Sequence, residues 1–186
     1  MKARWLTASL VVSFLAISSS AMAAPFTIQY LATDLSDVVG GEDLWRYSYS
    51  GSGFSFQANQ GFSVYFDDAR YLSLQSPVPA PNADWDVLTY QPDNVLNSPG
   101  VYDAFALANN ASLTDLFVVD FVWLGLPGTQ PGSQPFDVYE DDGSGQLSFL
   151  ESGVTTPAAV PEPSTLLMVA IGAVGLAVRV RRRLRI

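Results

Sequence analysis

One segment of the chain reproduces the spacing of a calcium-binding loop. Residues 140–151 place oxygen-bearing groups at the ligand positions of such a loop, namely Glu140, Asp142, Ser144, Gln146 and Glu151. The same residues also fit a hairpin turn over 142–145, because Asp and Gly favour tight turns between strands. Two departures favour the turn: a calcium loop normally begins with the shorter Asp, and residues 136–139 have the pattern of a strand where a helix should enter. Calcium is the one cofactor that the sequence indicates.

The residue types that are missing exclude most other catalytic chemistry. The chain has no Cys and no His, and its only Lys is Lys2. Triads built on His, zinc sites built on His or Cys, and Schiff-base lysines are therefore excluded. Carboxylate chemistry remains, as calcium ligands or as the paired Asp/Glu of glycoside hydrolases. Because no acid and nucleophile pair is recognisable, we expect no catalytic residues and no enzymatic activity.

Trp85 is a second candidate for binding, because Asp84 and Asp86 flank it. An exposed Trp can stack on a sugar ring while neighbouring carboxylates accept hydrogen bonds from the sugar hydroxyls. A Trp at the start of a strand is more often a core or edge residue. A sugar contact at Trp85 is therefore the alternative to a structural role.

The elements that must position these residues are short strands. Apolar and polar residues alternate in several segments that Gly, Pro, Asn and Asp separate, and only 101–113 is suited to a short helix. The segments with strand character are 26–30, 45–50, 54–56, 62–66, 71–74, 85–90, 116–124 and 136–139. This pattern predicts an all-β fold, an antiparallel β-sandwich of jelly-roll-like form.

The domain between the two chain ends is strongly acidic. We place it at residues 24–154, followed by a linker over 155–160. Between residues 24 and 160 lie 17 acidic side chains, all of the chain's 18 except Glu162, against Arg46 and Arg70. The negative electrostatic potential of such a domain repels nucleic acid, so we expect no nucleic-acid partner.

The segment 161–186 has the composition of a membrane anchor. It consists of the motif Pro161-Glu162-Pro163, the uncharged run 166–178, and a basic end with Arg179, Arg181, Arg182, Arg183 and Arg185. Thirteen apolar residues are short for a membrane span, but arginines can snorkel and extend it. The run therefore predicts a single C-terminal transmembrane helix with its arginines in the cytoplasm.

Residues 1–23 have the pattern of a secretory signal peptide. Lys2 and Arg4 precede an apolar run, and small residues follow it. Ala21 and Ala23 suit signal peptidase, with cleavage before Ala24 or one residue later. The acidic domain should therefore lie outside the cytoplasm.

The order of these signals resembles the PEP-CTERM sorting signal of exported bacterial proteins. The resemblance implies that exosortase, a membrane enzyme, recognises Pro161, Glu162 and Pro163 and processes the tail. It implies an inner-membrane-anchored protein that later reaches the cell envelope or extracellular matrix. We therefore expect a non-enzymatic surface or matrix protein, with exopolysaccharide as one candidate partner. A carbohydrate-binding or calcium-stabilised adhesion module is the alternative, and a carboxylate-dependent glycan hydrolase is a weaker one.

Overall fold

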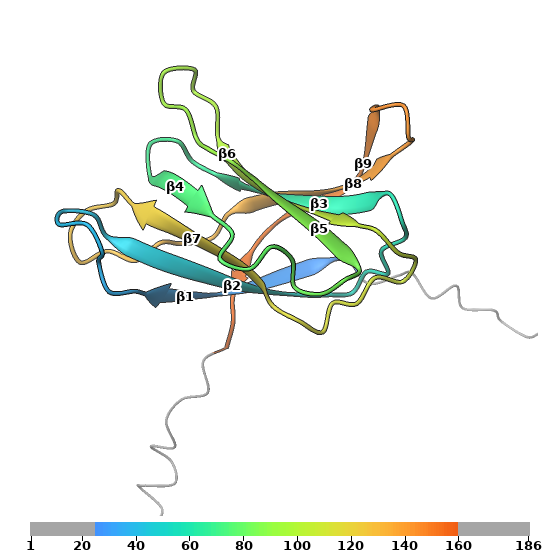
Figure 1. The fold of residues 1–186 in the computed structure, drawn as a ribbon, viewed down its shortest axis with the longest axis horizontal. Coiled ribbons are helices and arrows are strands. Elements are labelled where there is room, and N and C mark those ends of the chain that lie inside the picture. Colours follow the sequence, from blue (N-terminus) through green and yellow to red (C-terminus); the bar gives the residue numbers. More distant parts are fainter. Residues whose placement is uncertain (1–24, 160–186) are drawn as a thin grey trace, which may run out of the picture.

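Alternating large apolar side chains build both sheets of the domain. The computed structural model describes residues 25–159, which form ten strands in two five-stranded sheets (Figure 1). The strands are β1 (Thr27–Asp34), β2 (Leu44–Ser52), β3 (Gln60–Phe66), β4 (Tyr71–Gln75), β5 (Trp85–Tyr90), β6 (Gly100–Ala106), β7 (Phe117–Trp123), β8 (Pro135–Asp141), β9 (Leu147–Val154) and β10 (Thr156–Pro157). The predicted all-β fold with two sheets is confirmed for this part of the chain.

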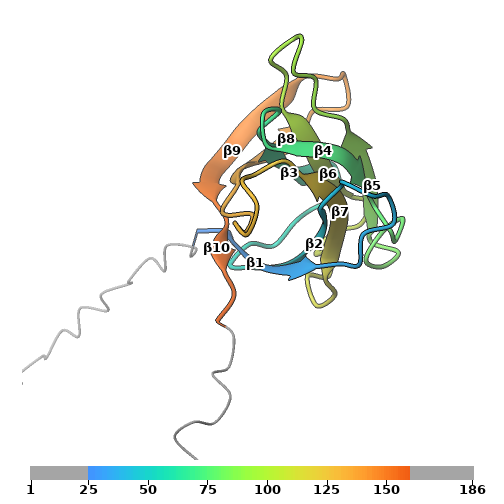
Figure 2. The ribbon, with the colours of Figure 1, turned by 90° about the vertical axis from the view of Figure 1, so that its left-hand side faces the viewer.

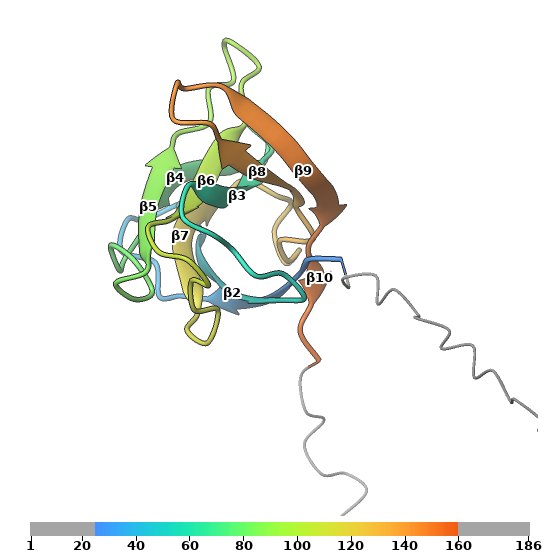
Figure 3. The same cartoon turned by 90° about the vertical axis from the view of Figure 1, so that its right-hand side faces the viewer.

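The strand order shows how the two sheets are connected. One sheet has the order β10-β1-β2-β7-β4, and the other has the order β5-β6-β3-β8-β9. Neighbouring strands are antiparallel, except that β10 runs parallel to β1. The chain passes from β9 in the second sheet to β10 in the first, and therefore joins the sheets along one side (Figures 2 and 3).

Aromatic side chains fill the space between the sheets. In β2 the residues Trp45, Tyr47 and Tyr49 point inward, as their alternation predicts, and the rings of Tyr47 and Phe121 stack with centroids 4.7 Å apart. The same interior contains Phe26, Phe56, Phe62, Phe66, Trp85, Tyr102, Phe117 and Phe136. Burial of aromatic rings contributes much of the favourable free energy of folding in a domain of this size.

A buried hydrogen-bond network lies among these rings, and Gln134 is at its centre with 1% of its surface exposed. The two hydrogens of its Nε2 are shared among three acceptors, the hydroxyls of Tyr47 and Tyr71 and the carbonyl of Gly132. Its Oε1 accepts from the hydroxyls of Tyr49 (3.0 Å) and Thr155 (3.1 Å). Every buried side-chain polar atom in residues 25–159 has a partner, as stability requires.

Three expectations about local structure are wrong. Residues 54–56, expected to be a strand, form no strand and lie in the connection between β2 and β3. The segment proposed as a short helix contains β6, whose residues alternate between the core and the outer face. The predicted linker also starts later than expected. Thr155 is fully buried, and Thr156 and Pro157 pair with β1 because the core continues to that point.

The predicted signal peptide and the predicted C-terminal helix at 166–178 lie outside the residues that the structure describes. Within 25–159, no helix is long and apolar enough to cross a membrane.

Candidate binding face

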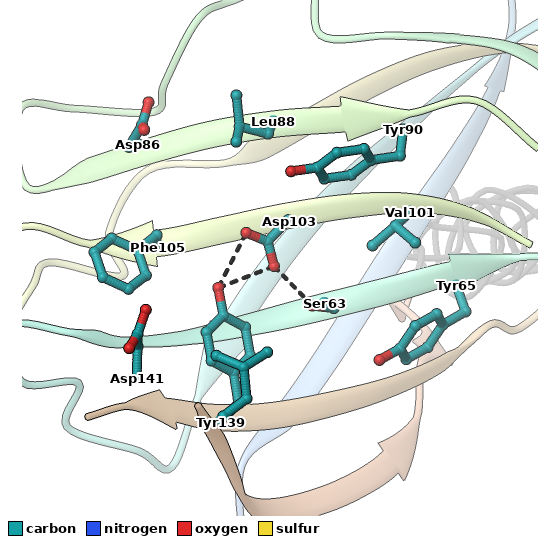
Figure 4. A pocket seen from close by; sticks show the side chains of 11 residues that line it. Ser63, Tyr65, Asp86, Leu88, Tyr90, Val101, Asp103, Phe105, Tyr139 and Asp141 are labelled. Carbon is teal, nitrogen blue, oxygen red and sulfur yellow. Dashed lines mark hydrogen bonds between the residues drawn. The ribbon is translucent and has the colours of Figure 1, made fainter. Parts of the chain in front are cut away.

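The outer surface of the sheet β5-β6-β3-β8-β9 contains a hollow of about 490 Å³ (Figure 4). Because side chains alternate along a strand, the residues between the core positions of these strands share this surface. The hollow is lined by Ser63, Tyr65, Asp86, Leu88, Tyr90, Val101, Asp103, Phe105, Tyr139, Asp141 and Leu147. We call this surface of the sheet the outer face.

Asp103 of β6 lies at the centre of the outer face, and neighbouring strands hold it in place. Its Oδ1 accepts a hydrogen bond from Ser63 Oγ at 2.7 Å. Tyr139 Oη of β8 lies 3.0 Å from both carboxylate oxygens (Figure 4). Burial and the neighbouring Asp103 raise the pKa of Tyr139, so its hydroxyl stays protonated and donates. The carboxylate is therefore fixed in orientation.

Gly61 of β3 makes this arrangement possible. Tyr139 is directly opposite Gly61 in the register of β3 and β8, and its ring passes over this glycine toward β6. A Cβ atom at position 61 would lie 2.6 Å from Tyr139 Oη and 2.7 Å from the carbonyl oxygen of Ala104. A glycine is required at position 61 for the Tyr139 ring to approach the backbone of β3 closely, because any side chain there would occupy the place of the ring.

Aromatic rings are exposed on the outer face. Among residues 25–159, the large aromatic side chains that are well exposed are Tyr90 of β5 (56%) and Phe149 of β9 (65%). Phe149 is opposite Tyr139 in the register of β8 and β9, and Leu147 of the same strand lines the hollow. Exposed rings of this size beside a hollow with both polar and apolar walls are typical of a binding site.

The hollow has a negative charge that no basic side chain of residues 25–159 compensates. Asp86, Asp103 and Asp141 line it, and neither of the domain's two arginines does. Arg46 forms a two-point ion pair with Asp120 on the other sheet, at 2.6 and 2.8 Å, and Arg70 lies 3.5 Å from Asp67. Burial raises the pKa of Asp103 above its ordinary value, the hydrogen bonds from Ser63 and Tyr139 oppose this, and the charge of Asp86 adds to it.

Asp103 should make the stability of the protein fall as the pH rises. Since its pKa is higher in the folded state than in the unfolded state, its contribution is present below the ordinary value of 3.8 and is lost as the pH rises through the folded pKa. We expect the difference in unfolding free energy between wild type and Asp103→Asn to decrease across this window in urea denaturation. Asp34→Asn, which removes the same charge from β1, is the control. A difference that stays flat or increases with pH would contradict the assignment.

The arrangement of these side chains suits the orientation of a bound ligand. Asp86 and Asp103 lie on neighbouring strands of one sheet face, whereas a glycoside hydrolase places its two carboxylates on either side of the scissile bond. Both oxygens of Asp103 also accept hydrogen bonds from other side chains. A fixed carboxylate between exposed rings can orient a ligand that donates hydrogen bonds.

Trp85, the predicted sugar contact, is part of the core. Only 2% of its surface is exposed, and its ring contacts Phe56, Phe62 and Phe117. Its Nε1 donates to the carbonyl of Ser112 at 2.8 Å. The ring has no free face for a sugar, so the structural role is the correct one. An inward position follows from the alternation of β5, which directs Asp86 outward instead.

The predicted calcium ligands are spread along a β-hairpin and do not surround a common point. Asp142 Oδ1 accepts hydrogen bonds from the backbone and side chain of Ser144 within the turn between β8 and β9. Glu140 is opposite Ser148 in the ladder, and Glu151 accepts from the backbone N–H of Phe26. Gln146 closes the turn through its carbonyl, which accepts from the N–H of Asp142. In residues 25–159 no three acidic side chains are grouped to hold a metal ion.

The other predicted site residues lie outside the described part of the chain. These are the signal-cleavage residues Ala21, Ala23 and Ala24, the sorting residues Pro161, Glu162 and Pro163, and the arginines Arg179, Arg181, Arg182, Arg183 and Arg185.

A family model identifies the segment that follows the domain. Residues 159–183 match the model of the PEP-CTERM protein-sorting motif. The chain carries a PEP-CTERM sorting signal. This motif implies an exported protein that exosortase recognises, and the expectation from the sequence is confirmed to that extent. The motif adjoins the domain closely, because β10 ends at Pro157.

Comparison with solved structures gives a distant similarity. A cohesin module from the family 33 glycoside hydrolase of Clostridium perfringens ATCC13124 is 13% identical, with a TM-score of 0.36. The alignment covers 72% of this chain and 97% of the module. The comparison with curated proteins found no match.

Proposed function

We propose that the protein is a non-enzymatic component of the cell surface or extracellular matrix, delivered there by its PEP-CTERM signal. The observation that carries the proposal is the sorting motif at 159–183, directly after the last strand of the acidic domain. The domain is the delivered part, and the motif directs it to its location.

The proposed route has three steps. Signal peptidase removes residues 1–23, and the segment 166–178 then holds the chain in the inner membrane with its arginines in the cytoplasm. Exosortase acts at the tail and releases the domain to the envelope or matrix. The excess of acidic residues over Arg46 and Arg70 supports this role, since high net charge keeps an exported domain soluble.

The absence of enzymatic activity is part of the proposal. The residue types left in the domain allow only carboxylate chemistry, and the half-buried Asp103 is bonded to Ser63 and Tyr139. These contacts support a role in orienting a ligand over one in moving a proton.

Mass spectrometry of the mature protein tests the sorting route. We expect the protein recovered from the envelope or medium of the producing cells to lack the segment that ends at Ile186. Replacing Glu162 with Gln should leave the intact tail on most of the protein, because the motif loses its charge. Glu151→Gln in the domain is the matched control and should be processed normally. If the mature wild-type protein retained Ile186, the proposed processing by exosortase would be wrong, and the protein would simply be anchored in the membrane by its tail.

A carbohydrate-binding module is the second candidate function. The exposed rings of Tyr90 and Phe149 support it, because exposed aromatic rings can stack on sugars. An exopolysaccharide would then be the ligand, on the outer face instead of at Trp85. No contact of the segment 140–151 favours the calcium-stabilised form of this module.

A further inference from the structure

We propose that the outer face binds a partner polypeptide that inserts a lysine or arginine side chain into the hollow above Asp103. The inference rests on the proposed non-enzymatic role of the domain, but it does not depend on how the protein is sorted. It names a site and a class of partner.

Charge complementarity indicates a cationic group. Asp86 is diagonal to Asp103 across β5 and β6, a position about 7–8 Å away in a sheet. With Asp141, these residues place negative charges around a half-buried hollow that neither Arg46 nor Arg70 lines. Like charges in a partly buried site repel each other, and a bound cation would relieve that repulsion.

The walls of the hollow suit the rest of a long basic side chain. Leu88, Val101 and Phe105 provide apolar surface for the methylene groups of lysine or arginine. Tyr90 presents an exposed ring beside the acidic centre, where a cation gains further attraction from the ring. Anionic ligands are excluded by the same carboxylates.

The acidic centre is organised before any ligand arrives. Ser63 and Tyr139 hold Asp103 in one orientation, and Gly61 lets the Tyr139 ring reach it. A fixed carboxylate loses little conformational entropy on binding, so more of the interaction energy contributes to affinity. A charge-assisted hydrogen bond to such a group is stronger than one between neutral groups.

The edge of the sheet favours a polypeptide over a sugar. Within residues 25–159, strand β9 is the last strand of this sheet and pairs with β8 alone, so one side of its backbone is unpaired there. Most of its residues are exposed, including Leu147 beside the hollow and Phe149. This edge lies three strands from β6, about 14 Å away, so a second segment of the same partner would pair there, whereas a glycan has no matching row of amide groups.

Titration of the purified full-length chain in nonionic detergent with a blocked peptide Gly-Leu-Lys-Leu-Gly tests the proposal. We expect the peptide to bind at least about tenfold more tightly than the same peptide with norleucine in place of lysine, because norleucine lacks the charge. Asp103→Asn and Asp86→Asn should each reduce the affinity for the lysine peptide about fivefold or more. High salt should reduce this affinity as well. Asp86→Asn is included because its side chain takes no part in the bonds to Tyr139.

Asp34→Asn is the matched control, since it removes one exposed charge from the other sheet. Binding must survive this change for the site to be specific. If Asp34→Asn and Asp86→Asn lowered the affinity for the lysine peptide equally, the effect would come from the net negative charge of the domain, and the proposal would be overturned. Equal affinity for the two peptides would also overturn it. Binding of a neutral glycan that Tyr90→Ala abolishes, without binding of the lysine peptide, would assign the face to a sugar. The sorting experiment is unaffected by any of these results.

Discussion

Replacing Gln134 with alanine should lower the free energy of unfolding by about 3–5 kcal/mol. The change removes the shared partner of four buried hydroxyl groups, those of Tyr47, Tyr49, Tyr71 and Thr155. A buried hydroxyl without a partner costs about 1–3 kcal/mol, and this cost falls mainly on Tyr49, which donates to the Gln134 amide. Tyr47 keeps its bonds to Tyr71 (3.2 Å) and to the carbonyl of Gly132 (2.7 Å), and Thr155 Oγ1 still accepts from the backbone N–H of residue 134. The lost side-chain volume adds a cavity. Equilibrium urea denaturation of the full chain measures the difference.

Gln130→Ala is the control for this experiment, because Gln130 is exposed and its loss removes no buried partner. We expect the control to differ from wild type by less than about 0.5 kcal/mol. If Gln134→Ala were equally mild, water would have to replace the amide in the network, and the proposed role of Gln134 in stability would be wrong.

Replacing Gly61 with alanine should cost about 2–3 kcal/mol of stability and disorganise the outer face. The new Cβ would meet the carbonyl oxygen of Ala104, which is backbone in the neighbouring strand and has no alternative position. It would also push Tyr139 away from Asp103, so the lysine peptide should bind several-fold more weakly. Urea denaturation and the peptide titration measure the two effects together.

Gly40→Ala separates this clash from the general effect of replacing a glycine. A Cβ atom at Gly40 would have no neighbour within 4 Å, and its backbone is not in the left-handed region. The control should therefore be neutral or slightly stabilising, because alanine restricts the unfolded chain. Similar losses for Gly61→Ala and Gly40→Ala would show that close packing of Tyr139 over Gly61 does not matter.

The sequence was sufficient for the fold where alternation was clear. The inward positions of Trp45, Tyr47 and Tyr49 follow from a period of two, and the segment 85–90 matches β5 in full. Prediction was wrong at 101–113, because small residues such as Ala104 and Ala106 suit a helix by propensity while packing between sheets places them in β6.

The outer face was harder to predict, because it depends on which strands become neighbours. Ser63, Asp103 and Tyr139 are far apart in the chain and meet only because β3 lies between β6 and β8. One signal was available: a single Asp at an outward position within an otherwise apolar strand, as Asp103 is in β6. The sugar contact considered as an alternative at position 85 is wrong for a related reason, since alternation in β5 directs Trp85 inward and Asp86 outward.

The passage of the chain from β9 to β10 has a mechanical consequence. Any pull on the sorting segment reaches the domain first at Ala158, whose N–H donates to the carbonyl of Tyr30, and then at the two-residue pairing with β1. Once this two-residue pairing is broken, the force would act on Thr155, which is hydrogen-bonded to Gln134 in the interior. A domain tethered through this end would therefore yield in two steps, with a weak release of β10 before the aromatic core resists.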